Sequence, residues 1–220
     1  LVYCLPLNHP IRHLEEICML DKMSNGRIEM GIGRGISPIE LDYYGLNYED
    51  GQAVYRETFD LITQGLINNE LTHKGEYFNV ANMPFPLSAV QKPHPPLWYG
   101  VANPASTEWP AQNGLNVITN QTVAATKEII VNYKKTWEST AQVSDQLPSL
   151  GMTRYLVIAK SKEKALSSAR RAYPVWRKSF MALWDLHGKE PIGVRYPPTF
   201  DGLMETGQGF AGTSAEVLDE

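Results

Sequence analysis

The sequence predicts an α/β protein whose strands run parallel, and three observations support this class. Apolar strand-like runs alternate with amphipathic helical segments along most of the 220 residues. The first helix lies between two such runs, residues 2–5 and 27–33, with short connections on either side, which is the pattern of a βαβ unit. Residues 97–101 form a continuous apolar run, which is typical of a strand buried within a parallel sheet.

Composition excludes several classes of function. The chain is 43% hydrophobic and 20% charged, with a formal net charge of -4, a pI of about 5.8 and no basic cluster, so we expect no nucleic-acid partner and no membrane surface. No apolar run is long enough to span a membrane, and no secretory signal is evident. The two cysteines, Cys4 and Cys18, have no metal-type spacing, so we expect buried thiols in a reducing, cytoplasmic compartment. A small molecule is the expected ligand.

The segment from Arg27 to Pro38 is the most informative part of the chain. In residues 27–33, apolar side chains alternate with other residues, the last two of which are glycines. A strand here would therefore have one apolar face, and near its end the opposite face would carry only the hydrogens of the glycines. Arg34 follows this strand, at the point where α/β proteins bind ligands, and its planar guanidinium suits a phosphate. The same residues also fit a tight turn with a solvated arginine, since the G-x-G-x-G spacing is not the dinucleotide fingerprint.

The next segments add a loop, a helix and a hairpin. Residues 36–52 are predicted to form a tyrosine-rich loop whose tyrosines either line the entrance for a substrate or simply pack within the loop. Helical spacing of apolar residues predicts a helix over 53–67. Residues 72–80 turn at Lys74-Gly75-Glu76 and predict a small hairpin.

A second candidate anion site follows the strand at 97–101. Asn103 is a suitable N-cap, Pro104 suits the first helical position, and Ser106 and Thr107 carry hydroxyls in the first turn. A helix that starts directly after a parallel strand points its free N–H groups towards the ligand side of the sheet. Simple capping explains the same residues, but two candidate anion sites on successive strand ends favour the functional interpretation.

The α/β alternation continues to the end of the sequence. Strands are predicted at 115–119 and 153–159, and helices at 123–138 and 162–186. Residues 188–209 are rich in proline and glycine and are predicted to form a long loop, either a lid or a disordered segment. Thr213 to Glu216 form a capping box that begins a helix. The count is about five strands, whereas a (β/α)8 barrel has eight.

Several segments together resemble the bacterial-luciferase-like family of flavin-dependent monooxygenases, and they are residues 5–10, 15–16, 20–27, 31–35, 105–109 and 212–213. The resemblance implies a TIM barrel, here a single incomplete domain over 1–220. It would contain about the third to the seventh strands and lack the first two and the eighth, with 187–209 as a lid or mobile loop. The unpaired strands at 2–5 and 153–159 then lead us to expect that the chain alone neither folds stably nor turns over substrate.

The family implies a function and partners. Its members use reduced FMN, supplied by a separate reductase, and O2 to insert one oxygen atom into a small organic substrate, whose identity the sequence does not reveal. Two alternatives remain: hydride transfer with the deazaflavin F420, and a non-catalytic flavin-binding relative. The family also forms dimers through neighbouring helices, so a homodimer is expected, with extra apolar residues on the helix at 11–23.

The resemblance also implies a cofactor site. Arg34 and the backbone of Ile36 would meet the flavin phosphate, Asn103 and Ser106 would complete that site, and Gly33 would lie against the reactive carbon of the ring. Gln52 stands where luciferases have a second phosphate-binding arginine, and Ala102 replaces a polar residue. The implied cofactor-binding residues are Gly33, Arg34, Gly35, Ile36, Gln52, Ala102, Asn103 and Ser106.

No catalytic residue is assigned to this sequence. The catalytic histidine of the family belongs to its second strand, which lies outside the chain, so no histidine here inherits that role. His9 and His13 are four residues apart at a predicted helix start, but no third ligand with a matching approach is evident and no metal is expected.

Overall fold

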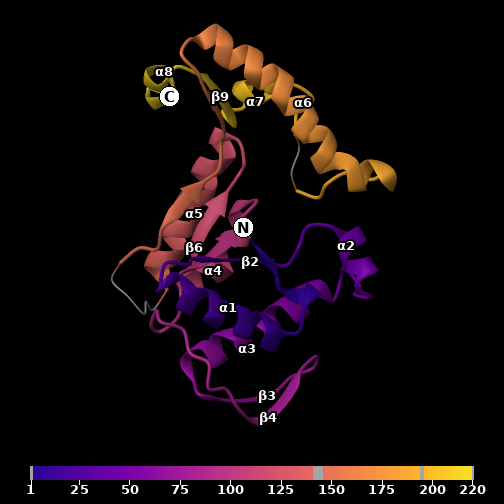
Figure 1. Ribbon diagram of the computed structural model, residues 1–220, viewed down its shortest axis with the longest axis vertical. Helices are drawn as coiled ribbons and strands as arrows, with labels where there is room; N and C mark the ends of the chain where they lie inside the picture. Colours follow the sequence, from indigo (N-terminus) through magenta and orange to yellow (C-terminus); the bar gives the residue numbers. More distant parts are fainter. Residues whose placement is uncertain (1, 141–145, 194–195, 220) are drawn as a thin grey trace. The chain divides into compact units, whose positions relative to one another are not determined.

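The structure, a computed structural model, describes residues 2–140, 146–193 and 196–219. The chain divides into two compact units, Leu1–Gly100 and Val101–Glu220, which appear in indigo to magenta and in magenta to yellow in Figure 1. Each unit has its own strands and its own buried side chains. The α/β class predicted from the sequence is confirmed in both.

The first unit is built on a parallel sheet. Its strands, in the order β1-β2-β5, are β1 (Tyr3–Cys4), β2 (Met30–Gly33) and β5 (Leu97–Gly100). Cys4 pairs with Gly33, and Ile32 pairs with Tyr99. The apolar side chains of β2 are buried on one face, and its glycines lie on the other. The predicted βαβ unit, with parallel strands, is therefore confirmed.

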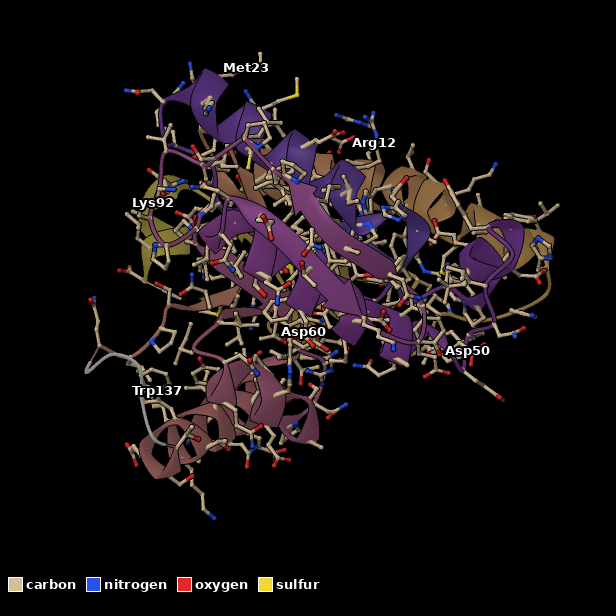
Figure 2. The ribbon with its side chains drawn as sticks, turned by 90° about the horizontal axis from the view of Figure 1, so that it is seen from below. Arg12, Met23, Asp50, Asp60, Lys92 and Trp137 are labelled. Atoms are coloured by element: carbon tan, nitrogen blue, oxygen red, sulfur yellow. The ribbon has the colours of Figure 1, made fainter. Side chains whose placement is uncertain are left out.

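Two long helices, α1 (Pro10–Ser24) and α3 (Gly51–Ile67), pack beside each other in this unit (Figure 1). Their approach depends on a glycine, because a Cβ at Gly65 would lie 2.3 Å from Cδ2 of Leu14. The helix α1 ends at Asn25, which adopts the left-handed conformation with φ 56°. Figure 2 shows Arg12 and Met23 on the outer side of α1, and the Met23 side chain is 79% exposed.

The remaining elements of the first unit are short. They are η1 (Leu5–Leu7), α2 (Pro38–Tyr43), β3 (Glu70–Lys74) and β4 (Asn79–Pro84). The strands β3 and β4 form the predicted antiparallel hairpin. The prediction of a loop throughout 36–52 is wrong at α2, where Ser37 caps the helix and Ile39 and Leu41 are buried. Burial of these two side chains stabilises the helix, whereas the surrounding tyrosines and glycines favoured the prediction of a loop.

The second unit begins with two short helices and a parallel strand pair. Its first elements are η2 (Pro104–Thr107), α4 (Glu108–Gln112), β6 (Asn116–Thr119), α5 (Val123–Ser139) and β7 (Leu150–Met152). β6 and β7 are parallel, with Val117 opposite Leu150. The hydroxyl of Tyr133, buried on α5, donates to the carbonyl of Leu115 at 2.7 Å. The strand β7 was not predicted from the sequence.

The rest of the second unit is a second parallel pair covered by helices. Its elements are β8 (Tyr155–Ile158), α6 (Lys162–Leu186), α7 (Phe200–Glu205), β9 (Gly209–Gly212) and α8 (Ser214–Leu218). Tyr155 pairs with Gly209, and both α6 and α7 contact β9. Ala165 and Ala169 of α6 and Phe200 and Leu203 of α7 form a buried cluster with the strands. The predicted capping box is confirmed at the start of α8.

The second unit corrects two expectations. The predicted strand at 153–159 does not lack a neighbour, because β8 pairs along its whole length with β9, which the strand count had missed. The second half of the predicted loop at 188–209 is the helix α7, capped by Thr199, whose Oγ1 accepts from the N–H of Gly202 at 3.2 Å. Phe200 and Leu203 are 2% and 0% exposed, so burial of these side chains stabilises helical structure in a proline- and glycine-rich stretch.

Among the residues that the structure describes, no helix is both long and apolar enough to cross a membrane.

Candidate functional site

Arg34 follows the carboxyl end of β2, as the sequence predicted. The chain turns there at Gly35, whose φ of 89° a residue with a side chain rarely adopts. The guanidinium lies over the ring of Tyr48, with Cζ 4.4 Å from the ring centroid, and Nη2 donates a hydrogen bond to the Tyr48 hydroxyl. Across residues 2–140, 146–193 and 196–219, no carboxylate lies within ion-pair distance of Arg34. The positive charge is therefore held in place without being neutralised.

The start of α3 lies beside Arg34. A Cβ on Gly51, the first residue of α3, would be 3.8 Å from Cγ and Cδ of the arginine. Gln52 follows in the same turn and is partly buried. The N–H of Gly51 is already bonded to the carbonyls of Asn47 and Tyr48, but the start of this 17-residue helix still carries the partial positive charge of the helix dipole. Arg34 and the first turn of α3 together favour an anion.

The glycine ends of β2 and β5 leave space beside the sheet. Ile32 pairs with Tyr99, so the next residues, Gly33 and Gly100, are neighbours on adjacent strands. A Cβ at Gly33 would come no closer than 3.7 Å to another side chain, that of Val2. A Cβ at Gly100 would meet no atom of the described residues within 4 Å. Gly100 was missed in the sequence analysis, although its position at the end of the strand paired with β2 could have indicated it.

The second candidate site is a capping box. Asn103 Oδ1 accepts from the N–H of Ser106 at 3.0 Å, and the Ser106 hydroxyl donates to the carbonyl of Asn103 at 2.6 Å. The N–H groups of Ala102 and Asn103 point at the same Oγ from 3.3 Å. The predicted N-cap and the placement of Pro104 at the start of the helix are confirmed. These groups surround one hydroxyl at the end of a strand.

Thr107 does not extend this site, so that expectation was wrong. Its side chain is fully buried, its hydroxyl donates to the carbonyl of Pro104 at 2.7 Å, and it accepts from Nδ2 of Asn132 at 2.8 Å. The tighter 3-10 geometry of η2 turns Thr107 towards α5 instead of towards solvent. Its hydroxyl is therefore structural.

The histidines and tyrosines that the sequence singled out have separate roles. His9 caps α1, with Nδ1 accepting from the N–H of Ile11 at 3.3 Å, and His13 is buried, with Nε2 3.3 Å from the carbonyl of Leu5. Burial lowers the pKa of His13. Tyr43 and Tyr44 are largely exposed. In the described part of the chain, no group of three or more histidine, cysteine or acidic side chains is arranged to hold a metal ion.

A family model described as luciferase-like monooxygenase matches residues 2–218 of this chain. The chain belongs to the luciferase-like monooxygenase family. The resemblance drawn from the sequence is thereby confirmed.

Two relatives illustrate the range of this luciferase-like family. A protein of undefined function from Sinorhizobium fredii is 36% identical over 217 residues, which cover 99% of this chain and 63% of that protein. The oxygenase component of a flavin-dependent trigonelline monooxygenase from Acinetobacter baylyi is 27% identical over 169 residues, 74% of this chain and 46% of that protein. The chain thus spans less than two thirds of the length of these relatives.

Solved structures show the luciferase-like α/β fold. Monooxygenase RslO1 from Streptomyces bottropensis superposes with a TM-score of 0.81 at 18% identity, over 96% of this chain and 62% of that one. The oxygenating constituent of 3,6-diketocamphane monooxygenase from Pseudomonas putida, in complex with FMN, superposes with a TM-score of 0.76 at 16% identity, over 99% of this chain and 66% of that one. An F420-dependent secondary alcohol dehydrogenase superposes with a TM-score of 0.67 at 15% identity, over 94% of this chain and 63% of that one.

Proposed function

We propose that this protein is the oxygenase of a two-component flavin-dependent monooxygenase, built on a (β/α)8 barrel. It would take reduced FMN from a separate reductase and insert one atom of O2 into a small organic molecule. The family is that of flavin-dependent monooxygenases, and the Acinetobacter relative is named as an oxygenase component, which supports a separate reductase.

The observation that carries the proposal is the uncompensated charge of Arg34 at the end of β2. Its guanidinium is fixed by a neutral phenol, it borders the first turn of α3, and within the described residues no carboxylate pairs with it. Such an arrangement attracts a dianion, because both the guanidinium and the helix start favour negative charge. A flavin phosphate meets this requirement.

The remaining contacts are proposed from the family resemblance. Arg34, with the backbone of Gly35 and Ile36, would bind the phosphate together with Gln52, and the capping box formed by Asn103 and Ser106 would complete the phosphate site. Within the first unit, the parallel pairing of β2 with β5 puts the carboxyl ends of the two strands, and hence Arg34 and Gly100, on one edge of their sheet.

The flavin ring would lie against the glycine ends of β2 and β5. Gly33 and Gly100 leave room there for a flat group, and side chains at either position would occupy it. When it is bound, reduced FMN would be the group that reacts with O2. The protein's part is to orient the ring and to keep water from the reacting atoms.

Two alternatives use the same site differently. F420 also carries a phosphate, and an F420-dependent dehydrogenase has a similar fold, so hydride transfer without O2 is the second candidate. A non-catalytic flavin-binding relative is the third. Formation of an oxygenated product from an added substrate, reduced FMN and O2 separates the first from both, since free reduced FMN consumes O2 on its own.

Of the predicted lid at 187–209, the part before α7, residues 187–193 and 196–199, is proposed to cover the bound substrate. Two hydrogen bonds hold the segment to the end of β6: Gln121 Nε2 donates to the carbonyl of Gly193 at 3.1 Å, and Asn120 Nδ2 donates to the Tyr196 hydroxyl at 2.9 Å. The hydroxyl of Tyr173 and Nε of Arg177 also donate to the carbonyls of Pro197 and Tyr196, so opening requires these bonds to break as well.

The experiment measures FMN affinity by titration calorimetry for the wild type and for Arg34→Ala. Loss of a hydrogen bond to a charged group should raise the Kd about 10- to 100-fold. Arg12→Ala is the matched control, because Arg12 is exposed and pairs only with Glu15 at 2.8 Å. An unchanged Kd for Arg34→Ala would refute the assigned site. Incorporation of 18O from labelled O2 into a supplied substrate, with FMN, NADH and a flavin reductase and compared with substrate turnover in the presence of F420, then decides the reaction type.

A further inference from the structure

The second unit contains a cavity that none of the proposed flavin contacts lines, although part of the segment 187–209 does. It has a volume of about 600 Å³ and lies among the start of α5, the second half of α6, residues 190–191 and residues 196–197. This volume is in the range of sites for small organic ligands. The cavity is therefore large enough for a molecule of one or two rings.

Hydrogen bonds fix the walls of this cavity. Gln208 Nε2 donates to the carbonyl of Asn120 at 2.6 Å, and the Tyr173 hydroxyl donates to the carbonyl of Pro197 at 2.7 Å. Tyr196 lines the cavity, and its ring packs edge-on against Trp176 and Phe180, with centroid distances of 5.1 and 4.9 Å. The aromatic packing holds Tyr196 in place, so the cavity is a preformed one.

Two opposite charges line the cavity without pairing. Arg177 and Glu190 both contribute to its surface. Arg177 donates from Nε to the carbonyl of Tyr196 at 3.2 Å, which orients the guanidinium and leaves its terminal nitrogens for another acceptor. In the described ranges, neither residue has an ion-pair partner, and they do not pair with each other. Each charge is thus available to a ligand.

Part of the remaining wall is apolar, and Thr122, Thr206 and Gln208 add polar groups to it. Met181, which is 7% exposed, and the rigid rings of Pro191 and Pro197 line the space that the charged groups share. A ligand with a hydrocarbon or aromatic body would bury apolar surface against them. A ligand with only one charge would leave either Arg177 or Glu190 beside it without a counter-ion.

We propose that this cavity binds a small zwitterionic organic molecule, with its carboxylate on Arg177, its cationic group on Glu190 and its body against Met181 and the two prolines. The proposal goes beyond the flavin site, since it uses residues of the second unit alone and requires no cofactor. Opposite charges on one ligand satisfy both protein charges at once, and this gives the pocket its selectivity.

Three ligands that share one ring test the proposal without flavin. Calorimetry on the purified protein compares 3-(trimethylammonio)benzoate with benzoate and with phenyltrimethylammonium. We expect the zwitterion to bind at least tenfold more tightly than either singly charged compound, since each loses one charged contact. Equal affinity for all three, or binding of none, would overturn the proposal while leaving the FMN result untouched.

Two variants assign the contacts. Arg177→Ala should reduce the affinity for the zwitterion to that for phenyltrimethylammonium, and Glu190→Gln should reduce it to that for benzoate. Arg177→Lys keeps the charge and should retain the preference for a carboxylate, which separates charge recognition from a loss of folding. Lys178→Ala, on the exposed side of α6, is the control and should bind as the wild type does. Zwitterion affinity that survives Arg177→Ala would overturn the assignment.

Discussion

The guanidinium of Arg34 lies over the ring of Tyr48, with Cζ 4.4 Å from the ring centroid, and donates a hydrogen bond to the hydroxyl of the same residue. Tyr48 thus fixes the direction of the arginine and adds no negative charge. A carboxylate in this position would compete with a phosphate for the guanidinium, whereas a phenol gives up its hydrogen bond at little cost.

Changing Tyr48 should therefore separate positioning from charge. Tyr48→Ala removes the surface that holds the guanidinium, so we expect the Kd for FMN to rise about fivefold, as loss of roughly 1 kcal/mol of cation–π interaction implies. Tyr48→Phe keeps the ring and should stay within about twofold of the wild type. Calorimetric titration of both variants is the measurement. A loss for Tyr48→Phe as large as that for Tyr48→Ala would show that the hydroxyl, and not the ring, carries the effect.

Gln52→Arg should strengthen flavin binding. Gln52 lies in the first turn of α3, next to Gly51, which borders Arg34, so a second guanidinium there would face the same anion. We expect the Kd for FMN to fall about tenfold at low salt, with a steeper dependence on ionic strength than in the wild type. Gln64→Arg, on the exposed side of the same helix, adds the same charge elsewhere and should change neither quantity. Identical titrations for the two variants would contradict the placement of the phosphate.

The hairpin β3-β4 is held to α3 by one carboxylate, and this contact should depend on pH. Glu57 accepts from the N–H groups of Glu76, Tyr77 and Phe78 at 2.7 to 3.2 Å and lies 3.1 Å from Nε2 of His73. Burial alone would raise the pKa of Glu57, but the hydrogen bonds outweigh it and hold the pKa below the ordinary value. A lowered folded-state pKa stabilises the protein above the ordinary value of 4.5, and this stabilisation is lost as the pH falls through the folded-state value.

Glu57→Gln tests this contact. At pH 7 we expect a loss of about 2 kcal/mol, or roughly 4 to 8 °C in Tm, because the amide cannot accept all of these hydrogen bonds. The difference from the wild type should shrink below pH 4.5, as the native carboxylate becomes protonated. Glu70→Gln, exposed at the start of β3, should melt as the wild type does. Thermal unfolding followed by circular dichroism at pH 7, 4 and 3 is the measurement, and a pH-independent difference would count against the mechanism.

The helix α1 carries more apolar surface than its own unit buries, as the sequence analysis expected. Met19, Leu20 and Met23 are 52%, 45% and 79% exposed, and Met23 points outward in Figure 2. We predict a homodimer through this surface. Met19→Glu combined with Met23→Glu should convert a micromolar dimer into a monomer in sedimentation, whereas Val175→Glu, 67% exposed on α6, should not. A wild-type protein that sediments as a monomer at micromolar concentration would contradict the prediction.

The long elements could be predicted from the sequence because their patterns are local. The helices α3 and α5 were placed within two residues, since apolar side chains recur along one face of each. The strands β7 and β9 were missed for a different reason. β9 is Gly-Phe-Ala-Gly, which has little strand propensity of its own and exists because β8 pairs with it. Such tertiary support leaves no local signature.

The candidate site was predicted in part. Arg34 and Asn103 were identified because a cation and a cap that directly follow strands are unusual enough to be noticed. The direction of a hydroxyl within a turn is not encoded in the same way, so Thr107 was assigned to the ligand side although Asn132 of α5 holds it. The opposite charges of Arg177 and Glu190 are thirteen positions apart in the sequence, and only the folded chain brings them to one cavity.

The pairing of β8 with β9 also sets an order of events during synthesis. The ribosome produces β8 first, and the whole of α6 and α7 must follow before β9 emerges. Until then β8 has an open edge, and the apolar side chains of α6 that will contact β9 have no strand to cover. This stretch of the nascent chain is therefore where we expect chaperones to bind and where slow translation would expose the protein longest to aggregation.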